Sequence, residues 1–323
     1  MRARQAVIDR IGGPEVIAWQ NVDLPPPGPG QALVRHTAIG LNFIDTYHRS
    51  GLYPVELPGG LGLEAAGIVE AVGEGVDLAP GDRVATFGPE RGAYASARIV
   101  AAASLIKLPD DIADDVAAAA LLKGCTAEFL VERCGRVEPG WPVLVHAAAG
   151  GVGLLLVQWL KAAGAEVIGT VGSEDKAGLA REAGADHVLR SGGDLAAEVR
   201  ALTGGAGVRV TFDGVGKATW AASLAATARR GLLVSYGNAS GAVGPVDFAV
   251  LARSGSLFVT RPTLFDYYAD AGERAAGAAR LFEMLRSGRL RVEIGRRHRL
   301  EDAAAAHRDL EARRTTGSSL LIP

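Results

Sequence analysis

A glycine-rich loop between an apolar strand and an apolar helix carries the strongest chemical signal in the chain. It comprises His146-Ala-Ala-Ala-Gly-Gly-Val-Gly153, which from Ala148 onward follows the pattern Ala-x-Gly-x-x-Gly. Glycines at a strand-to-helix turn let the backbone approach a pyrophosphate, and the helix N-terminus adds N–H donors. The sequence therefore predicts a dinucleotide site at Ala149, Gly150, Gly151, Val152 and Gly153. The alternative is a tight turn without a ligand.

The tip of the next predicted strand indicates which dinucleotide binds. NAD sites place an Asp or Glu about 20 residues beyond the loop, where it accepts from the ribose 2′-hydroxyl. Here Glu166-Val-Ile-Gly-Thr-Val-Gly-Ser173 ends without an acid, and Gly172, Ser173 and Lys176 occupy this region. A hydroxyl and an ammonium suit a 2′-phosphate, which favours NADPH over NADH. Ser173 can at the same time cap the following helix, since Glu174 and Asp175 suit its first turn.

Composition limits the class of protein. A length of 323 residues predicts two domains, and a net charge of -2 gives no general attraction to nucleic acid or an anionic membrane. Two cysteines exclude a disulfide framework. The longest apolar stretch, 143–160, contains His146, Gln158 and glycines, so it predicts a strand and a helix rather than a membrane span. The first residues lack the apolar core of a signal peptide, and we expect a soluble, cytoplasmic protein.

The elements fall into two kinds along the chain. The first third is rich in strands and turns, and 25–30 is too rich in Pro and Gly for a helix or a central strand. This part predicts a compact, mostly antiparallel β domain. From about Asp111, predicted strands alternate with helices, which predicts a doubly wound parallel sheet. The strands are 143–146, 166–170, 187–189, 208–212 and 231–236, and the helices 152–163, 175–183, 195–202, 218–228 and 271–285. A helix at 300–310 and a strand at 319–323 follow.

Further motifs connect the chain to a known family. Gly62-Leu-Glu-Ala-Ala-Gly-Ile-Val69 and Gly81-Asp-Arg-Val84, together with the glycine loop, resemble the medium-chain dehydrogenase/reductase superfamily. The resemblance narrows to the zeta-crystallin-like NADPH:quinone reductases through 39–47, 49–54, 123–124, Gly231, 236–238, 259–262 and 317–323. It spans essentially the whole chain and implies an α/β fold, a Rossmann doubly wound parallel sheet plus a GroES-like, mostly antiparallel β domain. The expected domains are 1–122 with 290–323 for catalysis, and 123–289 for nucleotide binding.

The resemblance also bears on metal. Zinc alcohol dehydrogenases of this superfamily bind catalytic zinc through Cys and His. The resemblance implies that this chain has Asn42 at the position of that Cys and Leu63 at the position of that His. Cys125 and Cys134 would fall on opposite faces of one helix. We therefore expect no metal. Without a Lewis acid to stabilise an alkoxide, reduction of a quinone or an activated enone is favoured over alcohol oxidation.

Site residues follow from the resemblance, position by position. It implies Asn42, Asp45 and Tyr47 beside the nicotinamide as catalytic candidates, with Asn42 also binding the cofactor. It implies the following further cofactor contacts: Thr126; Ser173, Lys176 and Arg313 at the adenosine phosphate; and Tyr236, Gly237 and Asn238 on the nicotinamide side. Relatives often carry a Tyr near the adenosine phosphate, and Arg190 stands near that position. It either replaces the Tyr as a partner of the phosphate or points to solvent. Structural roles remain open: Asn42 for loop backbone, Asp45 as cap of a helix at 46–49, and Tyr47 as packing.

The partners expected are a small quinone and a second copy of the chain, with no nucleic acid and no membrane. Relatives are dimers, and 255–260 predicts an exposed edge strand suited to such pairing. An enone or alkenal double-bond reductase is the alternative enzyme. An RNA-binding or structural crystallin-like protein is the alternative outside enzymes, against which the balanced charge and 6% aromatic content argue. The sequence identifies no proton donor.

Overall fold

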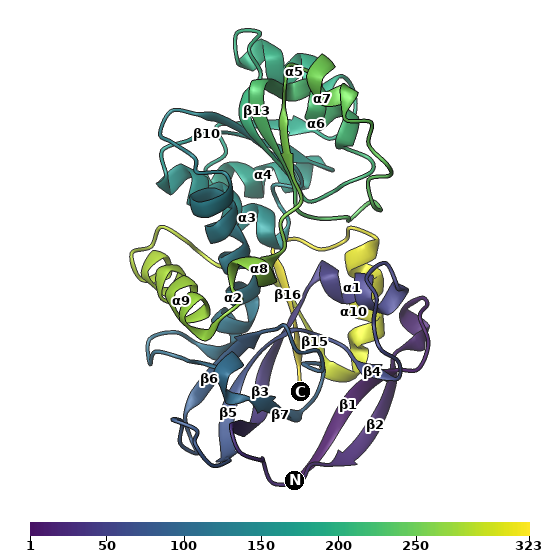
Figure 1. The fold of residues 1–323 in the computed structure, drawn as a ribbon, viewed down its shortest axis with the longest axis vertical. Coiled ribbons are helices and arrows are strands. Elements are labelled where there is room, and N and C mark those ends of the chain that lie inside the picture. The colour runs from purple at the N-terminus through teal and green to yellow at the C-terminus, as the bar shows by residue number, and fades with distance from the viewer. The chain divides into compact units, whose positions relative to one another are not determined.

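The computed structural model describes residues 1–323 and divides into two compact units (Figure 1). Unit 1 comprises Met1–Lys123, Tyr268–Phe282 and Val292–Pro323, and unit 2 comprises Gly124–Tyr267 and Glu283–Arg291. Residues 268–282, which lie within the predicted domain 123–289, group with unit 1 in this division. The reason is visible at Tyr268, whose buried ring packs edge-on against Phe87 at 5.4 Å. Gly277 leaves room for that ring, because a β-carbon there would lie 2.2 Å from a ring carbon.

Unit 1 is built on two sheets. A three-stranded sheet has the order β2-β1-β4, and a seven-stranded sheet has the order β15-β16-β3-β5-β6-β8, with β7 also paired to β3. All of these pairs are antiparallel except β15 with β16. The strands are β1 (Arg2–Ile8), β2 (Ala18–Asp23), β3 (Gln31–Leu41), β4 (Gly59–Gly60), β5 (Glu64–Val72), β6 (Arg83–Phe87), β7 (Ala97–Ala101), β8 (Ile106–Lys107), β15 (Ile294–Arg299) and β16 (Ser318–Ile322).

The helices of unit 1 cover one of its hydrophobic cores. They are α1 (Phe43–Ser50) and α10 (Ala303–Glu311), with 3-10 turns at Pro14–Val16, Ala102–Ser104 and Leu300–Asp302. The core joins apolar side chains of β1, β3 and α10, among them Ile8, Ile39 and Ala306. Two further helices, α2 (Asp114–Glu128) and α9 (Ala271–Arg286), contribute residues to both units, and a π-helical turn at Phe129–Cys134 extends α2.

Unit 2 is a parallel sheet of six strands in the order β11-β10-β9-β12-β13-β14. The strands are β9 (Pro142–Val145), β10 (Glu166–Val171), β11 (His187–Arg190), β12 (Val208–Asp213), β13 (Thr227–Ser235) and β14 (Phe258–Thr260). The helices are α3 (Gly151–Ala162), α4 (Glu174–Glu182), α5 (Leu195–Leu202), α6 (Trp220–Ala226), α7 (Ala249–Arg253) and α8 (Leu264–Tyr267). Numbered within the unit, the order is 3-2-1-4-5-6, the arrangement of dinucleotide-binding Rossmann folds. The predicted fold class is confirmed.

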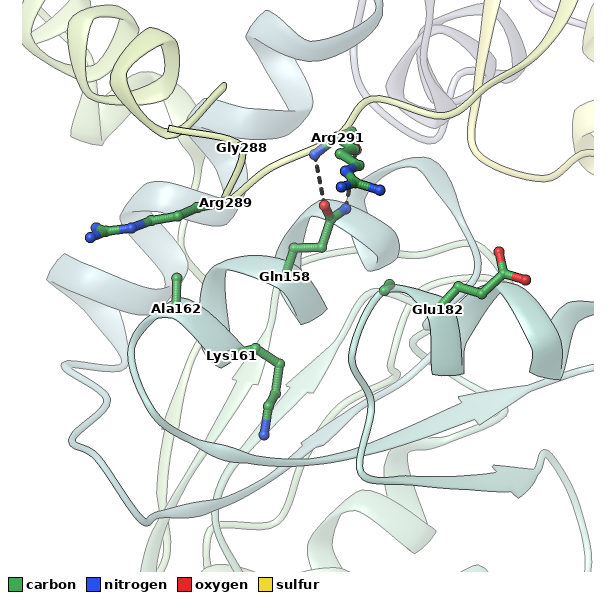
Figure 2. A pocket seen from close by; sticks show the side chains of 8 residues that line it. Gln158, Lys161, Ala162, Glu182, Gly288, Arg289 and Arg291 are labelled. Carbon is green, nitrogen blue, oxygen red and sulfur yellow. Dashed lines mark hydrogen bonds between the residues drawn. The ribbon is translucent and has the colours of Figure 1, made fainter. Parts of the chain in front are cut away.

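An amide side chain ties the last segment of unit 2 to α3. Figure 2 shows Gln158 on α3 facing the backbone of Arg291. The Gln158 Oε1 accepts from the Arg291 N–H at 2.7 Å, and its Nε2 donates to the Arg291 carbonyl at 3.1 Å. One side chain thus makes the pair of bonds that a neighbouring strand would make, beside a surface hollow of about 410 Å³. None of the helices combines the length and apolar character needed to span a membrane.

Candidate functional site

The glycine loop has the geometry that a phosphate cradle requires. Gly150 is the N-cap of α3 with an extended backbone, so the first N–H groups of the helix lack intrahelical acceptors. A β-carbon at Gly153 would lie 2.2 Å from the Ala147 carbonyl oxygen, and one at Gly150 would lie 3.2 Å from it. Gly153 therefore lets the first turn of α3 pack closely against the loop at Ala147 and Ala148. Helix N-terminal amides and the helix dipole make this turn suitable for a pyrophosphate.

A second group of predicted residues lies together at the tips of β10 and β11. Gly172 is exposed and has open space around it, and Ser173 is the N-cap residue of α4. Ser173 therefore occupies the predicted N-cap position, but its hydroxyl makes no capping hydrogen bond. Lys176 stands in the first turn of α4, and Arg190 pairs in register with Val171 of β10. The structure thus places Arg190, an exposed residue, on the strand beside the Gly172–Ser173 turn.

Asp213 organises the loops after β12 and β13. Its Oδ1 accepts from the N–H groups of Val215 and Gly216 at 2.8 and 3.0 Å. Its backbone carbonyl accepts from the Tyr236 N–H at 2.9 Å. Gly237 packs against this turn so closely that a β-carbon would lie 2.4 Å from the Gly214 oxygen. Tyr236, Gly237 and the buried Asn238 are therefore brought to the carboxyl end of the sheet, where such folds bind their ligands.

A buried chain of hydrogen bonds fixes the end of β9 to its neighbours. The Ser223 hydroxyl donates to Asp213 Oδ2 at 2.7 Å and lies 2.9 Å from His146 Nε2. Because the single Ser223 proton goes to the carboxylate, Nε2 of His146 must be the donor to Ser223. Its Nδ1 then accepts from the Thr170 hydroxyl at 3.2 Å. Burial lowers the pKa of His146, which keeps this imidazole neutral.

The three catalytic candidates of unit 1 lie on α1. Asn42 is its N-cap, and Asp45 at the third helical position accepts from the Asn42 N–H at 2.9 Å. The alternative of Asp45 capping a helix at 46–49 was therefore wrong, because the helix begins at Phe43 and Asn42 occupies the cap. Tyr47 is buried between Phe43 and Tyr53, with ring centroids at 5.9 and 5.2 Å.

Asp45 ends a directed chain of buried hydrogen bonds. Arg49 Nη1 lies 3.1 Å from His307 Nδ1 and must be the donor, since a guanidinium only donates. Nε2 of His307 therefore carries the proton and donates to the Tyr94 oxygen at 3.0 Å. The Tyr94 hydroxyl in turn donates to Asp45 Oδ2 at 2.9 Å. Burial raises the pKa of Asp45 to about 7 and lowers that of His307 to about 3.

Sequence reasoning missed a buried ion pair beside Asn42. Glu64 Oε2 accepts from Asn42 Nδ2 at 2.9 Å and from Lys123 Nζ at 3.2 Å. Glu64 belongs to a recognised motif but carried no predicted role. Lys123 had a signal, because it is a lone charge after the apolar run 116–122. Its partner Glu64 lies 59 positions away in the chain, so no local sequence pattern could predict the pair.

The remaining predicted contacts are placed separately. Thr126 lies on the unit 2 part of α2 and is 8% exposed. Arg313 is an exposed residue of unit 1, directly after α10, with a left-handed backbone at φ 57°. Their convergence with the other cofactor residues stays a prediction.

No group of three or more His, Cys, Asp or Glu side chains is arranged to hold a metal ion. Leu63 is fully buried, Asn42 donates to Glu64, and neither Cys125 nor Cys134 is in a disulfide. The residues present therefore do not fit a zinc centre at these positions.

Comparisons with known proteins agree with this architecture. Residues 28–110 match the alcohol dehydrogenase GroES-like domain family, and 151–271 match the family described as zinc-binding dehydrogenase. A quinone oxidoreductase of Pseudomonas aeruginosa is 50% identical over 99% of this chain and 100% of its own length. A 2-haloacrylate reductase of Burkholderia is 45% identical over 98% of each chain.

A solved structure extends the likeness to three dimensions. The quinone oxidoreductase of Escherichia coli in complex with NADPH has a TM-score of 0.97 and 45% identity, covering 99% of this chain and all of its own. The likeness therefore includes both units and the glycine loop. The chain belongs to the quinone oxidoreductases of the medium-chain dehydrogenase/reductase superfamily.

Proposed function

We propose that this protein reduces quinones with NADPH and without a catalytic metal. The observation that carries the proposal is the likeness, over nearly the full length of both chains, to a quinone oxidoreductase solved in complex with NADPH. The cradle formed by Gly150 and Gly153 supports it, because this geometry admits a dinucleotide pyrophosphate.

The chain's own residues divide the binding work. The first turn of α3 holds the pyrophosphate, and Ser173, Lys176, Arg190 and Arg313 surround the 2′-phosphate, where cation–phosphate hydrogen bonds are strong. Tyr236, Gly237, Asn238 and Thr126 bind the nicotinamide side. When bound, NADPH supplies two electrons and one proton to the acceptor, while the protein supplies position and electrostatics.

On α1 the three predicted residues take different roles. Asn42 lies beside the reacting groups and is held by Glu64, and Tyr47 lies beside the acceptor. Asp45 is a positioning residue, since it is fully buried and its Oδ2 accepts from both Asn42 and Tyr94.

A second candidate substrate class is an activated alkene. The relative from Burkholderia, 45% identical, is a 2-haloacrylate reductase, so an electron-poor double bond is an acceptor used within the same family. Quinones and such alkenes share an acceptor carbon conjugated to a carbonyl group, and hydride addition to either needs no metal.

The test is NADPH consumption with a panel of 1,4-quinones, a medium-chain enone and 2-chloroacrylate, each with and without a metal chelator. We expect the highest kcat/KM with a quinone and no effect of the chelator. A higher kcat/KM with the alkenes would favour the second candidate, and sensitivity to the chelator would overturn the metal-free mechanism.

We also propose a homodimer that works in the cytoplasm. The edge strand β14 supports the dimer, because it pairs on one side only and carries Phe258, which is 64% exposed. Exposed edge strands favour pairing with a second chain. The predicted domains, 1–122 with 290–323 and 123–289, remain our proposal for the catalytic and cofactor-binding parts.

A further inference from the structure

Four buried side chains of unit 1 form what we call the charged cluster: Asn42, Asp45, Glu64 and Lys123. None is more than 5% exposed. Lys123 Nζ and Asn42 Nδ2 both donate to Glu64 Oε2, at 3.2 and 2.9 Å. Asp45 accepts from the Asn42 N–H, and the charges of Glu64 and Lys123 both act on it. The cluster therefore holds two carboxyl groups and one ammonium.

The backbone is shaped to admit this cluster. A β-carbon at Gly40 would lie 2.1 Å from Glu64 Oε2 and 2.4 Å from the Ala118 oxygen, so only glycine lets β3 pass the carboxylate. The Leu122 N–H donates to Glu64 Oε1 at 2.7 Å, which fixes the carboxylate against α2 directly before Lys123. Asn42 and two residues of α2 thus hold the Glu64 carboxylate in one orientation, and Gly40 leaves room for it.

A buried ion pair of this kind is not explained by stability. Desolvation of two charges costs several kcal/mol per ion, and apolar replacements of buried pairs are often equally or more stable. Around this pair α2 offers Ala, Leu and Val in abundance. The pair is therefore a candidate for a role other than stability.

The hydrogen bonds show which member can act on a ligand. Both oxygens of Glu64 are occupied. Asp45 Oδ2 accepts from Asn42 and from Tyr94, and its Oδ1 is buried without a hydrogen-bond partner, but an ionised carboxylate offers acceptors and no donor. The Lys123 ammonium carries three N–H donors, of which Glu64 accepts one. Lys123 is therefore the member with donors to offer a further acceptor.

We propose that Lys123 is the catalytic acid that protonates the reduced quinone oxygen, and that Glu64 is the positioning residue that holds its ammonium. The inference rests on the proposed function. The quinone gains a hydride, which carries two electrons, and becomes a hydroquinone monoanion. One Lys123 N–H bond breaks, an O–H bond forms on that anion, and neutral hydroquinone leaves with a neutral amine behind. The amine regains its proton from water.

The first measurement is quinone reduction by the wild type and by Lys123→Met, with NADPH affinity followed separately by fluorescence titration. We expect kcat to fall on the order of 10²–10⁴-fold, as for loss of a general acid. We expect the Kd for NADPH to stay within about twofold of the wild type, because Lys123 is not among the residues assigned to cofactor binding. A kcat within about threefold of the wild type would overturn the proposal.

Further variants separate proton donation from structure and charge. The double variant Glu64→Gln, Lys123→Met removes both charges, so no buried charge is left unpaired. It decides the question if Lys123→Met alone misfolds, and we expect the same loss of kcat. Lys123→Arg keeps the charge but holds its proton far more tightly. We expect it to remain slow, and full rescue of kcat would refute proton donation.

A control and the wild type complete the design. Lys107→Met removes a surface lysine of unit 1 that pairs with Asp82, and its kcat should match the wild type. If none of the quinones supports NADPH oxidation by the wild type, the proposed function fails. If the wild type turns over and Lys123→Met keeps its rate, only the role of Lys123 fails.

Discussion

Gly40 illustrates how a single missing β-carbon shapes the site. Residues of β3 around it are buried and apolar, and any of them would satisfy the strand pattern. Only the closeness of the Glu64 carboxylate and the Ala118 carbonyl requires glycine there. A sequence pattern cannot show this requirement, because both neighbours are distant in the chain.

We predict that Gly40→Ala destabilises the protein by about 1–3 kcal/mol, the usual cost of overpacking. The Glu64 carboxylate must shift, so the loss of quinone turnover should exceed what unfolding accounts for. Urea unfolding and kcat measure the two effects. Gly178→Ala is the matched control, because its added β-carbon meets nothing within 4 Å, and alanine inside a helix should stabilise by about 0.5–1 kcal/mol. Equal stability of the two variants would contradict the steric argument.

Lys176 provides a residue-scale test of cofactor choice. We predict that Lys176→Ala weakens NADPH binding by on the order of 1–3 kcal/mol, because a charge-assisted hydrogen bond to phosphate is lost. NADH lacks that phosphate, so its affinity should hardly change. Titrating both cofactors against wild type and variant measures the difference. An equal loss for both would show that Lys176 supports the fold of α4 instead.

Helix α1 depends on an element from the other end of the chain. Its Asp45 receives the hydrogen bond of Tyr94, which receives that of His307 on α10. Arg49 on α1 reaches back to His307 and forms a bidentate pair with Glu311. The two helices are therefore held by polar contacts inside the core, where unpaired groups are costly.

We predict that Tyr94→Phe destabilises unit 1 by about 1–3 kcal/mol, because His307 loses its acceptor and Asp45 loses a donor in a buried place. Urea unfolding followed by circular dichroism measures this loss. The aromatic ring is retained, so apolar packing is unchanged. An unfolding midpoint equal to the wild type would mean that this chain of hydrogen bonds contributes nothing.

Elements with local signals were predictable, and contacts between distant segments were not. Helix α5 has the predicted bounds of Leu195–Leu202, and the glycine loop begins α3 within one residue of the prediction. Helix α6 ends at Ala226, two residues early, because the buried Thr227 starts β13 with a hydroxyl contact to Thr211. The Glu64–Lys123 ion pair and the contact of His307 with Tyr94 escaped prediction, because each joins segments far apart in sequence.

At the scale of the whole molecule, buried neutral histidines set its response to acid. Burial lowers the pKa of His36 and of His307 to about 3, from 6.5. The unfolded chain then binds more protons than the folded one between pH 3 and 6.5, so their contribution to stability is present above 6.5 and is lost as the pH falls. Asp45 acts oppositely, because its raised pKa favours the folded state at low pH.

We predict a falling free energy of unfolding between pH 6.5 and 4, since two histidines outweigh one carboxyl group. Urea unfolding at a series of pH values measures this slope. His307→Gln should flatten the slope by about one proton, while also lowering stability at neutral pH. A stability that rises on acidification would contradict the assignment of neutral buried histidines.

The proposed dimer is testable at its edge strand. We predict that Phe258→Lys yields a monomer with an intact fold, because a charge at an exposed edge position opposes strand pairing. Sedimentation velocity measures the mass, and circular dichroism checks the fold. Ile11→Lys, which alters an exposed apolar residue of unit 1 at 52% exposure, should leave the mass unchanged. An identical mass for all three proteins would argue against pairing through β14.

The antiparallel pairing of β16 with β3 imposes an order on folding during synthesis at the ribosome. When residues 1–123 have emerged, β3 still lacks that neighbour, and Tyr94 still lacks His307. Most of unit 2 is one continuous stretch, Gly124–Tyr267, so it can complete its sheet while the polypeptide is still attached. Domains near the N-terminus usually fold first during translation. Here the N-terminal segment is made first but completed last, and a nascent chain released before residue 318 would carry a finished parallel sheet in unit 2 and an unfinished unit 1.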